Sequence, residues 1–90
     1  MAIKAIAELL AAQAALKIFV VGHTDNVGTL ASNLTLSRQR TEAVVAALVA
    51  NHGVAPSRLV ADGVGPLAPV APNDSEEGRQ KNRRVEIVAQ

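Results

Sequence analysis

The sequence predicts one small α/β domain, a two-layer sandwich with helices on one face of a small sheet. Ninety residues leave room for a single domain, which we place at 1–90. Helical and strand patterns alternate along the chain, an order typical of α/β folds. The core must be aliphatic, because Phe19 is the only aromatic residue in a chain that is 49% hydrophobic.

The first predicted elements are a helix and a strand. Ala2 to Ala15 places isoleucine and leucine at three- and four-residue steps, which indicates an amphipathic helix. Lys17 to Gly22 changes to β-branched and aromatic residues and predicts a buried strand. Charged and amide side chains interrupt the apolar residues before Val21, so we expect this stretch to belong to the mature domain rather than to a secretion signal or a membrane span.

The longest helical pattern runs from Leu34 to Asn51. Gly53 follows it at the position where a left-handed C-terminal cap is expected. The predicted buried stripe of this helix consists of Leu36, Ala43, Val44, Ala47 and Leu48.

The last third of the chain predicts four short segments. These are a strand at Leu59–Val64, a loop with three prolines at Gly65–Pro72, a helical turn that Asn73 or Asp74 caps and that ends near Gln80, and a strand at Arg84–Ala89. Since a helix joins the first two strands, we expect those strands to be parallel, with a right-handed crossover.

Composition excludes several classes of function. The chain has no cysteine, which excludes thiol catalysis, disulfides and cysteine-ligated zinc. It also has no tryptophan or tyrosine on which bases or sugar rings could stack. The formal net charge of +1 argues against nucleic acid as a partner.

The densest polar cluster, Gly22–Gly28, comes directly after the first predicted strand. In α/β sheets, ligands bind beyond the carboxyl ends of the strands, where the next helix also begins. Asp25 and Arg40 can therefore line one pocket and bind a ligand that carries both an ammonium and a carboxylate. The alternative is that Asp25 caps its own turn and Arg40 is a solvated helix residue.

Other candidate chemistry is weaker. His23 and Asp25 could belong to a metal-dependent hydrolase, but a metal site normally needs three or four ligands. The sequence shows no nucleophile–base pair and no phosphate-binding glycine loop, so we expect neither catalysis nor a cofactor or metal. The basic run Arg79–Arg84 is flanked by glutamates, which favours a structural role over phosphate binding.

Four short motifs carry a family resemblance. They are VGHTDNVG at Val21–Gly28, Asn33 followed by LSRQR at Leu36–Arg40, NDSEEGR at Asn73–Arg79, and NRRVEI at Asn82–Ile87. In this order, over about residues 2–88, the chain resembles the OmpA-like peptidoglycan-binding domain, which also occurs in the peptidoglycan-associated lipoprotein and in MotB. The resemblance implies an α+β version of the sandwich with a small mixed sheet.

The resemblance also implies a function. It implies a non-catalytic module that anchors an envelope protein to the cell wall, on the periplasmic side of the outer membrane of a Gram-negative bacterium. Asp25 and Arg40 would hold the diaminopimelate of the peptide stem, and Leu36 would pack on its aliphatic part. Asn33 and Thr24 would line the rim, while Arg83 is a lesser candidate and Arg84 is expected to enter the last strand.

One departure from the family pattern concerns the sheet. The family's first strand has no counterpart here, which implies an open edge at Arg84–Ala89. An unpaired edge invites pairing with a second copy, so we expect a homodimer. The alternative function is therefore a structural or protein-interaction domain that has lost ligand binding.

Overall fold

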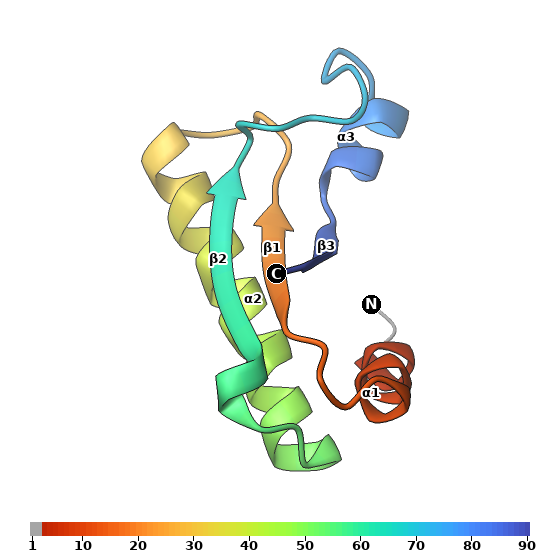
Figure 1. Ribbon diagram of the computed structural model, residues 1–90. Helices are drawn as coiled ribbons and strands as arrows, with labels where there is room; N and C mark the ends of the chain where they lie inside the picture. The colour runs from red at the N-terminus through yellow and green to blue at the C-terminus, as the bar shows by residue number, and fades with distance from the viewer. Residues whose placement is uncertain (1–2) are drawn as a thin grey trace.

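The computed structural model describes residues 3–90 and contains three helices and three strands among them (Figure 1). In chain order, the elements are α1 (Ile3–Ala12), β1 (Ile18–His23), α2 (Leu30–His52), a 3-10 turn (Pro56–Arg58), β2 (Leu59–Gly65), α3 (Glu76–Asn82) and β3 (Val85–Ala89). The predicted order of elements is confirmed, with boundaries shifted by a few residues.

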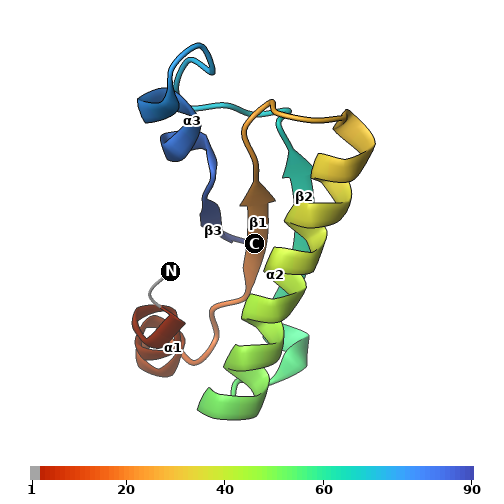
Figure 2. The ribbon, with the colours of Figure 1, turned by 180° about the vertical axis from the view of Figure 1, so that it is seen from behind.

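The three strands form a mixed sheet in the order β2-β1-β3. β1 is parallel to β2, as predicted from the helix that joins them, and antiparallel to β3. Helix α2 runs along one face of β1 and β2, while α3 lies beyond the end of the sheet above β3 (Figures 1 and 2). The predicted two-layer α+β sandwich is confirmed.

Helix α2 begins earlier than predicted. Its first residue is Leu30 rather than Leu34, because the side chain of Thr29 accepts a hydrogen bond from the Ser32 amide at 3.0 Å and caps the helix. At the other end, Gly53 adopts the expected left-handed conformation with φ of 65°. The added turn places the helix start near the loop that follows β1.

The buried stripe of α2 differs from the prediction. Val44 and Leu48 are buried as expected, but Leu36 and Ala43 are exposed and Ala47 is half-buried. In the N-terminal half of α2 the buried stripe is instead polar and consists of Asn33, Ser37 and Thr41.

Glycines in the sheet explain this polar stripe. A Cβ atom at Gly22 would lie 2.5 Å from the Ser37 carbonyl oxygen, and one at Gly63 would lie 2.4 Å from the Arg38 amide nitrogen. The helix backbone therefore approaches the sheet too closely for large apolar side chains. Short hydroxyl residues fit in this space, and Ser37 Oγ accepts a hydrogen bond from the Gly65 amide at 3.0 Å.

The hydrophobic core lies at the end of the sandwich that holds the start of β1 and the C-terminal half of α2. Ile6 and Leu10 of α1 join Ile18 and Val20 of β1 and Leu48 of α2. Arg58 fixes the end of α1 by donating hydrogen bonds to carbonyl oxygens at 2.7–3.0 Å. The acceptors are Leu10, Gln13 and Leu16. Helix α1 ends at Ala12, three residues before the predicted end.

The face of the sheet opposite the helices is open to solvent. Phe19 lies between Val60 and Val88 in the strand register, and all three side chains are exposed. The expectation of a buried first strand is therefore wrong for this face, since β1 alternates between buried and exposed residues. No helix among residues 3–90 has both the length and the apolarity needed to cross a membrane.

The C-terminal segment also departs from the prediction in detail. Ser75, rather than Asn73 or Asp74, caps α3, and its side chain accepts a hydrogen bond from the Gly78 amide at 3.1 Å. The helix extends to Asn82 rather than Gln80. Arg84 stands one residue before β3.

Candidate functional site

The loop after β1 is shaped by its own polar side chains. Asp25 Oδ1 accepts a hydrogen bond from the Val27 amide at 3.0 Å, which makes a local turn. The Thr24 hydroxyl donates to the Asp25 carbonyl oxygen at 2.8 Å, and the Asn33 side-chain amide donates to the Val27 carbonyl oxygen at 2.9 Å. Thr24 and Asn33 are buried, so within this chain they hold the loop that carries Asp25.

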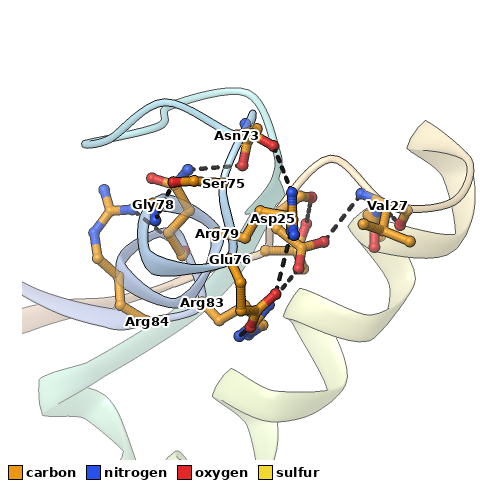
Figure 3. A network of polar contacts seen from close by, with 12 residues as sticks. Asp25, Val27, Asn73, Ser75, Glu76, Gly78, Arg79, Arg83 and Arg84 are labelled. Carbon is orange, nitrogen blue, oxygen red and sulfur yellow. Dashed lines mark hydrogen bonds and ion pairs between the residues drawn. The ribbon is translucent and has the colours of Figure 1, made fainter.

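The second oxygen of Asp25 binds an arginine from the far end of the chain. Arg83 Nη1 donates to Asp25 Oδ2 at 2.7 Å, and Arg83 Nη2 donates to Glu76 of α3 (Figure 3). Because β3 is antiparallel to β1, its start lies beside the end of β1. This topology brings Arg83, just before β3, to the carboxylate that follows β1.

These contacts fix the charge of Asp25. The Val27 amide and then the Arg83 guanidinium hold the pKa of the Asp25 carboxyl below its usual range. The pKa of Glu76 is likewise lowered, chiefly by its hydrogen bonds from Arg83 and Arg79. Both carboxylates are therefore ionised at neutral pH, although Asp25 is buried and only 9% exposed.

A cavity of about 440 Å³ opens beside this ion pair. Arg40, Arg83, Arg84 and Val85 line it. Arg84 is bound to Glu86, with Nε at 2.9 Å from a carboxylate oxygen, and also donates to the Ala68 carbonyl oxygen.

Arg40 differs from the other arginines of the chain. Within residues 3–90, each of the other five binds a carboxylate or backbone carbonyls, whereas Arg40 makes no hydrogen bond or ion pair. Its guanidinium is exposed and faces a cavity with two further arginines. Leu36, one turn earlier on α2, is also exposed. An unpaired guanidinium on a concave surface is suited to binding a carboxylate.

Helix α3 and the loop before it hold Arg83 in place. The fully buried side chain of Asn82 binds the Val70 and Ala71 amides and the Ala71 carbonyl oxygen at 2.8–3.1 Å. A Cβ atom at Gly78 would lie 1.8 Å from the Pro72 carbonyl oxygen, so α3 touches this loop directly. Arg83, which follows Asn82 in the chain, is thereby held near Asp25.

His23 is the last residue of β1 and lies at the same end of the sheet as Asp25. It is buried, with Nε2 at 3.3 Å from a Glu86 carboxylate oxygen, but neither ring nitrogen forms a well-aligned hydrogen bond within the described chain. Burial first, and the charge of Arg84 second, lower the pKa of His23. Residues 3–90 contain no group of three histidine or acidic side chains that could hold a metal ion.

The structure thus brings together part of the predicted site. Asp25 and Arg40 do not contact each other; Arg83 links them, because it binds Asp25 and lines the cavity with Arg40. The alternative interpretation describes their contacts, since Asp25 caps its turn and Arg40 is solvated, and the ligand-binding role of the two residues stays a prediction. Glu76 and Arg84 were missed. An antiparallel last strand would have indicated that Arg84, just before it, lies near the end of β1, whereas no local signal identifies Glu76.

Chemically, the site combines a buried carboxylate with an unpaired guanidinium that lines a nearby cavity. A carboxylate accepts hydrogen bonds from an ammonium, and a guanidinium donates two parallel hydrogen bonds to a carboxylate. The arrangement is suited to a zwitterionic ligand.

Comparisons with known proteins show which proteins this chain is similar to. The sequence model of the OmpA family matches residues 1–83. Outer membrane protein A of Bordetella avium is 49% identical over 78% of the chain, and the peptidoglycan-binding protein ArfA of Mycobacterium tuberculosis is 46% identical over 80%. The crystal structure of the peptidoglycan-associated lipoprotein from Burkholderia pseudomallei superposes with a TM-score of 0.89 and 34% identity, covering 98% of this chain and 74% of that one.

The two sequence relatives are much longer than the matched region. The match covers 36% of the Bordetella protein and 22% of the mycobacterial protein.

Proposed function

This chain belongs to the OmpA family, and on this basis we propose that it is a non-catalytic peptidoglycan-binding module that anchors an envelope protein to the cell wall. The observation that carries the proposal is the unpaired Arg40 guanidinium on a cavity that it shares with Arg83, the partner of Asp25. The names of two relatives support it, since one is a peptidoglycan-binding protein and the other a peptidoglycan-associated lipoprotein.

The proposed ligand is the diaminopimelate residue of the peptide stem. Its side chain ends in an ammonium and a carboxylate, the two groups for which this site offers partners. Asp25 would accept from the ammonium, Arg40 would bind the carboxylate, and the exposed Leu36 would pack on the aliphatic part. Thr24 and Asn33 would act through the loop that they hold, and Arg83 would orient Asp25.

The ionisation state of the site supports binding rather than catalysis. Asp25 has a lowered pKa, which makes it a poor general acid at neutral pH. Arginine stays protonated at such pH and cannot act as a general base. Charged groups of this kind hold a ligand by electrostatic attraction and exchange no proton with it.

The proposed location follows from the partner. A module that binds peptidoglycan works where peptidoglycan lies, so we place this domain on the periplasmic side of the outer membrane of a Gram-negative bacterium. The relatives named as outer membrane protein and as lipoprotein are consistent with this location. Nucleic acid is not a proposed partner.

Co-sedimentation with insoluble peptidoglycan tests the proposal. Wild-type protein should pellet with purified cell walls, and a titration with increasing amounts of cell wall should show that Asp25→Ala and Arg40→Ala each weaken the affinity at least ten-fold, because loss of a charged partner costs about 1.5–3 kcal/mol. Arg38→Ala is the matched control: Arg38 is also exposed on α2, but it forms an ion pair with Asp62, at 3.5 Å. Equal binding by Arg40→Ala and Arg38→Ala would contradict the site assignment.

A second candidate function rests on the open edge of the sheet. His23 N donates to the Arg84 carbonyl oxygen at 2.8 Å, and Gln90 N donates to the Lys17 carbonyl oxygen at 2.9 Å. Because paired residues alternate along an antiparallel ladder, Val85, Ile87 and Ala89 direct their backbone groups away from β1. In residues 3–90 no strand lies beyond β3.

This edge could pair with β3 of a second copy, as a homodimeric protein-interaction domain would require. In a symmetric antiparallel pair, Ile87 would lie opposite Ile87 of the partner and Val85 opposite Ala89. Sedimentation equilibrium tests the pairing, and Ile87→Pro should shift a dimer to monomer by removing a central donor. A wild-type monomer at millimolar concentration would contradict the dimer.

A further inference from the structure

The guanidinium of Arg83 is divided between two carboxylates. One terminal nitrogen binds Asp25 Oδ2 at 2.7 Å, and the other binds Glu76 Oε1 (Figure 3). Asp25 comes from the loop after β1, and Glu76 comes from the first turn of α3. The contact of Arg83 with Asp25 is therefore monodentate, although an arginine can bind a carboxylate in a bidentate manner, with two parallel hydrogen bonds.

This division leaves hydrogen-bonding capacity on Asp25. A carboxylate has about four lone-pair positions. Within the described chain, Oδ1 accepts one hydrogen bond, from the Val27 amide, and Oδ2 accepts one, from Arg83. A bidentate contact with Arg83 would occupy a third lone-pair position on the Asp25 carboxylate, so a ligand ammonium would find fewer acceptors.

Glu76 also sets the local charge. Asp25 and Glu76 together balance Arg83 and Arg79, whose Nε lies 3.2 Å from Glu76 Oε2. Without Glu76, the two arginines would outweigh Asp25 and the cluster would be positive. A positive cluster repels an ammonium.

We propose that Glu76 is a positioning residue for the ammonium of the ligand. It binds Nη2 of Arg83, and so leaves lone pairs of the Asp25 carboxylate free to accept hydrogen bonds from the ammonium. The inference rests on the proposed function and assigns a second acidic residue to that site. Glu76 itself need not touch the ligand. Its side chain is 65% exposed, so its ion pairs contribute little to folding, and its removal should leave the fold intact.

Glu77 provides a matched control on the same helix. It shares the first turn of α3 with Glu76 and has the same favourable interaction with the helix dipole. It is even more exposed, and its ion pair is with Lys81, at 3.6 Å, away from Asp25. Glu77→Gln therefore removes the same charge from the same turn without releasing Arg83.

The first measurement needs no ligand. Side-chain carboxyl NMR of the full chain gives the pKa of Asp25 in wild type, Glu76→Gln and Glu77→Gln. In Glu76→Gln, both terminal nitrogens of Arg83 can bind Asp25, and the negative charge of Glu76 is gone. The pKa of Asp25 should therefore fall further. In Glu77→Gln it should match wild type, and the same value in Glu76→Gln would overturn the inference.

The second measurement is the affinity for a soluble muropeptide that contains meso-diaminopimelate, by calorimetry. Glu76→Gln should bind roughly ten-fold more weakly than wild type, the loss expected when a charged acceptor is partly covered, and Glu77→Gln should bind like wild type. If wild type and Glu76→Gln bind equally well, the positioning role is overturned while the proposed function stands. If wild type itself does not bind, the proposed function is overturned together with this role.

Discussion

Asn82 is the residue whose loss should most disturb the support of the site. Its side chain is fully buried and makes four hydrogen bonds, to the Val70 and Ala71 amides, the Ala71 carbonyl oxygen and Asn73 Oδ1. It joins the loop after β2 to α3, which carries Arg83 into the site. Asn82→Ala removes all four contacts and leaves partly buried polar groups without these partners.

The cost can be estimated from these contacts. At about 1 kcal/mol net per hydrogen bond, with some groups regaining water, we expect Asn82→Ala to lower the free energy of unfolding by about 2–4 kcal/mol. For a domain of this size, that corresponds to a fall in Tm of roughly 10–25 °C. Asn73→Ala removes only one of these side-chain contacts and should cost about 1 kcal/mol.

Urea unfolding followed by circular dichroism at 222 nm measures both variants, since the chain has no tryptophan to serve as a fluorescence probe. The reasoning would be refuted if Asn82→Ala were no less stable than Asn73→Ala. It would also be refuted if the Asn82 variant kept wild-type affinity for cell walls at a temperature where part of it is unfolded.

Three further changes test the packing, the pH dependence and the anchoring of α1. Gly22→Ala places a Cβ atom 2.5 Å from the Ser37 carbonyl oxygen and should cost about 1–3 kcal/mol, measured by urea unfolding; an unchanged midpoint would contradict the close helix–sheet contact. Burial and Arg84 lower the pKa of His23, so the unfolded chain binds a proton first as pH falls. Stability should therefore decline as pH drops below about 6.5, and His23→Gln should flatten that part of the profile. Arg58→Ala should lower stability by roughly 2–4 kcal/mol through lost contacts to three carbonyl oxygens of the α1 end, and hydrogen exchange should show α1 opening before the sheet.

The pattern of the sequence predicts most of the fold for identifiable reasons. The alternation of helix and strand, the glycine after α2 and the prolines before α3 each act locally, and local signals survive in the structure. The stripe of α2 was mispredicted because hydrophobicity alone favoured Leu36 and Ala43. The true contact depends on Gly22 and Gly63, which lie in other elements and let the helix approach.

The candidate site shows the same limit. Asp25 could be identified because it follows a strand in a polar loop, and Arg40 because it lies on the next helix. The role of Arg83 depends on a pairing between β1 and β3, which are more than sixty residues apart. Glu76 is harder still to predict, since nothing in its local sequence distinguishes it from Glu77.

NMR titration with two soluble muropeptides tests the central claim most directly. One contains meso-diaminopimelate, and the other contains lysine, which keeps the ammonium but lacks the side-chain carboxylate. The account predicts chemical shift changes at Asp25, Leu36 and Arg40 with the first ligand and much weaker changes with the second. Equal responses to both ligands, or shifts confined to residues away from the cavity, would contradict it.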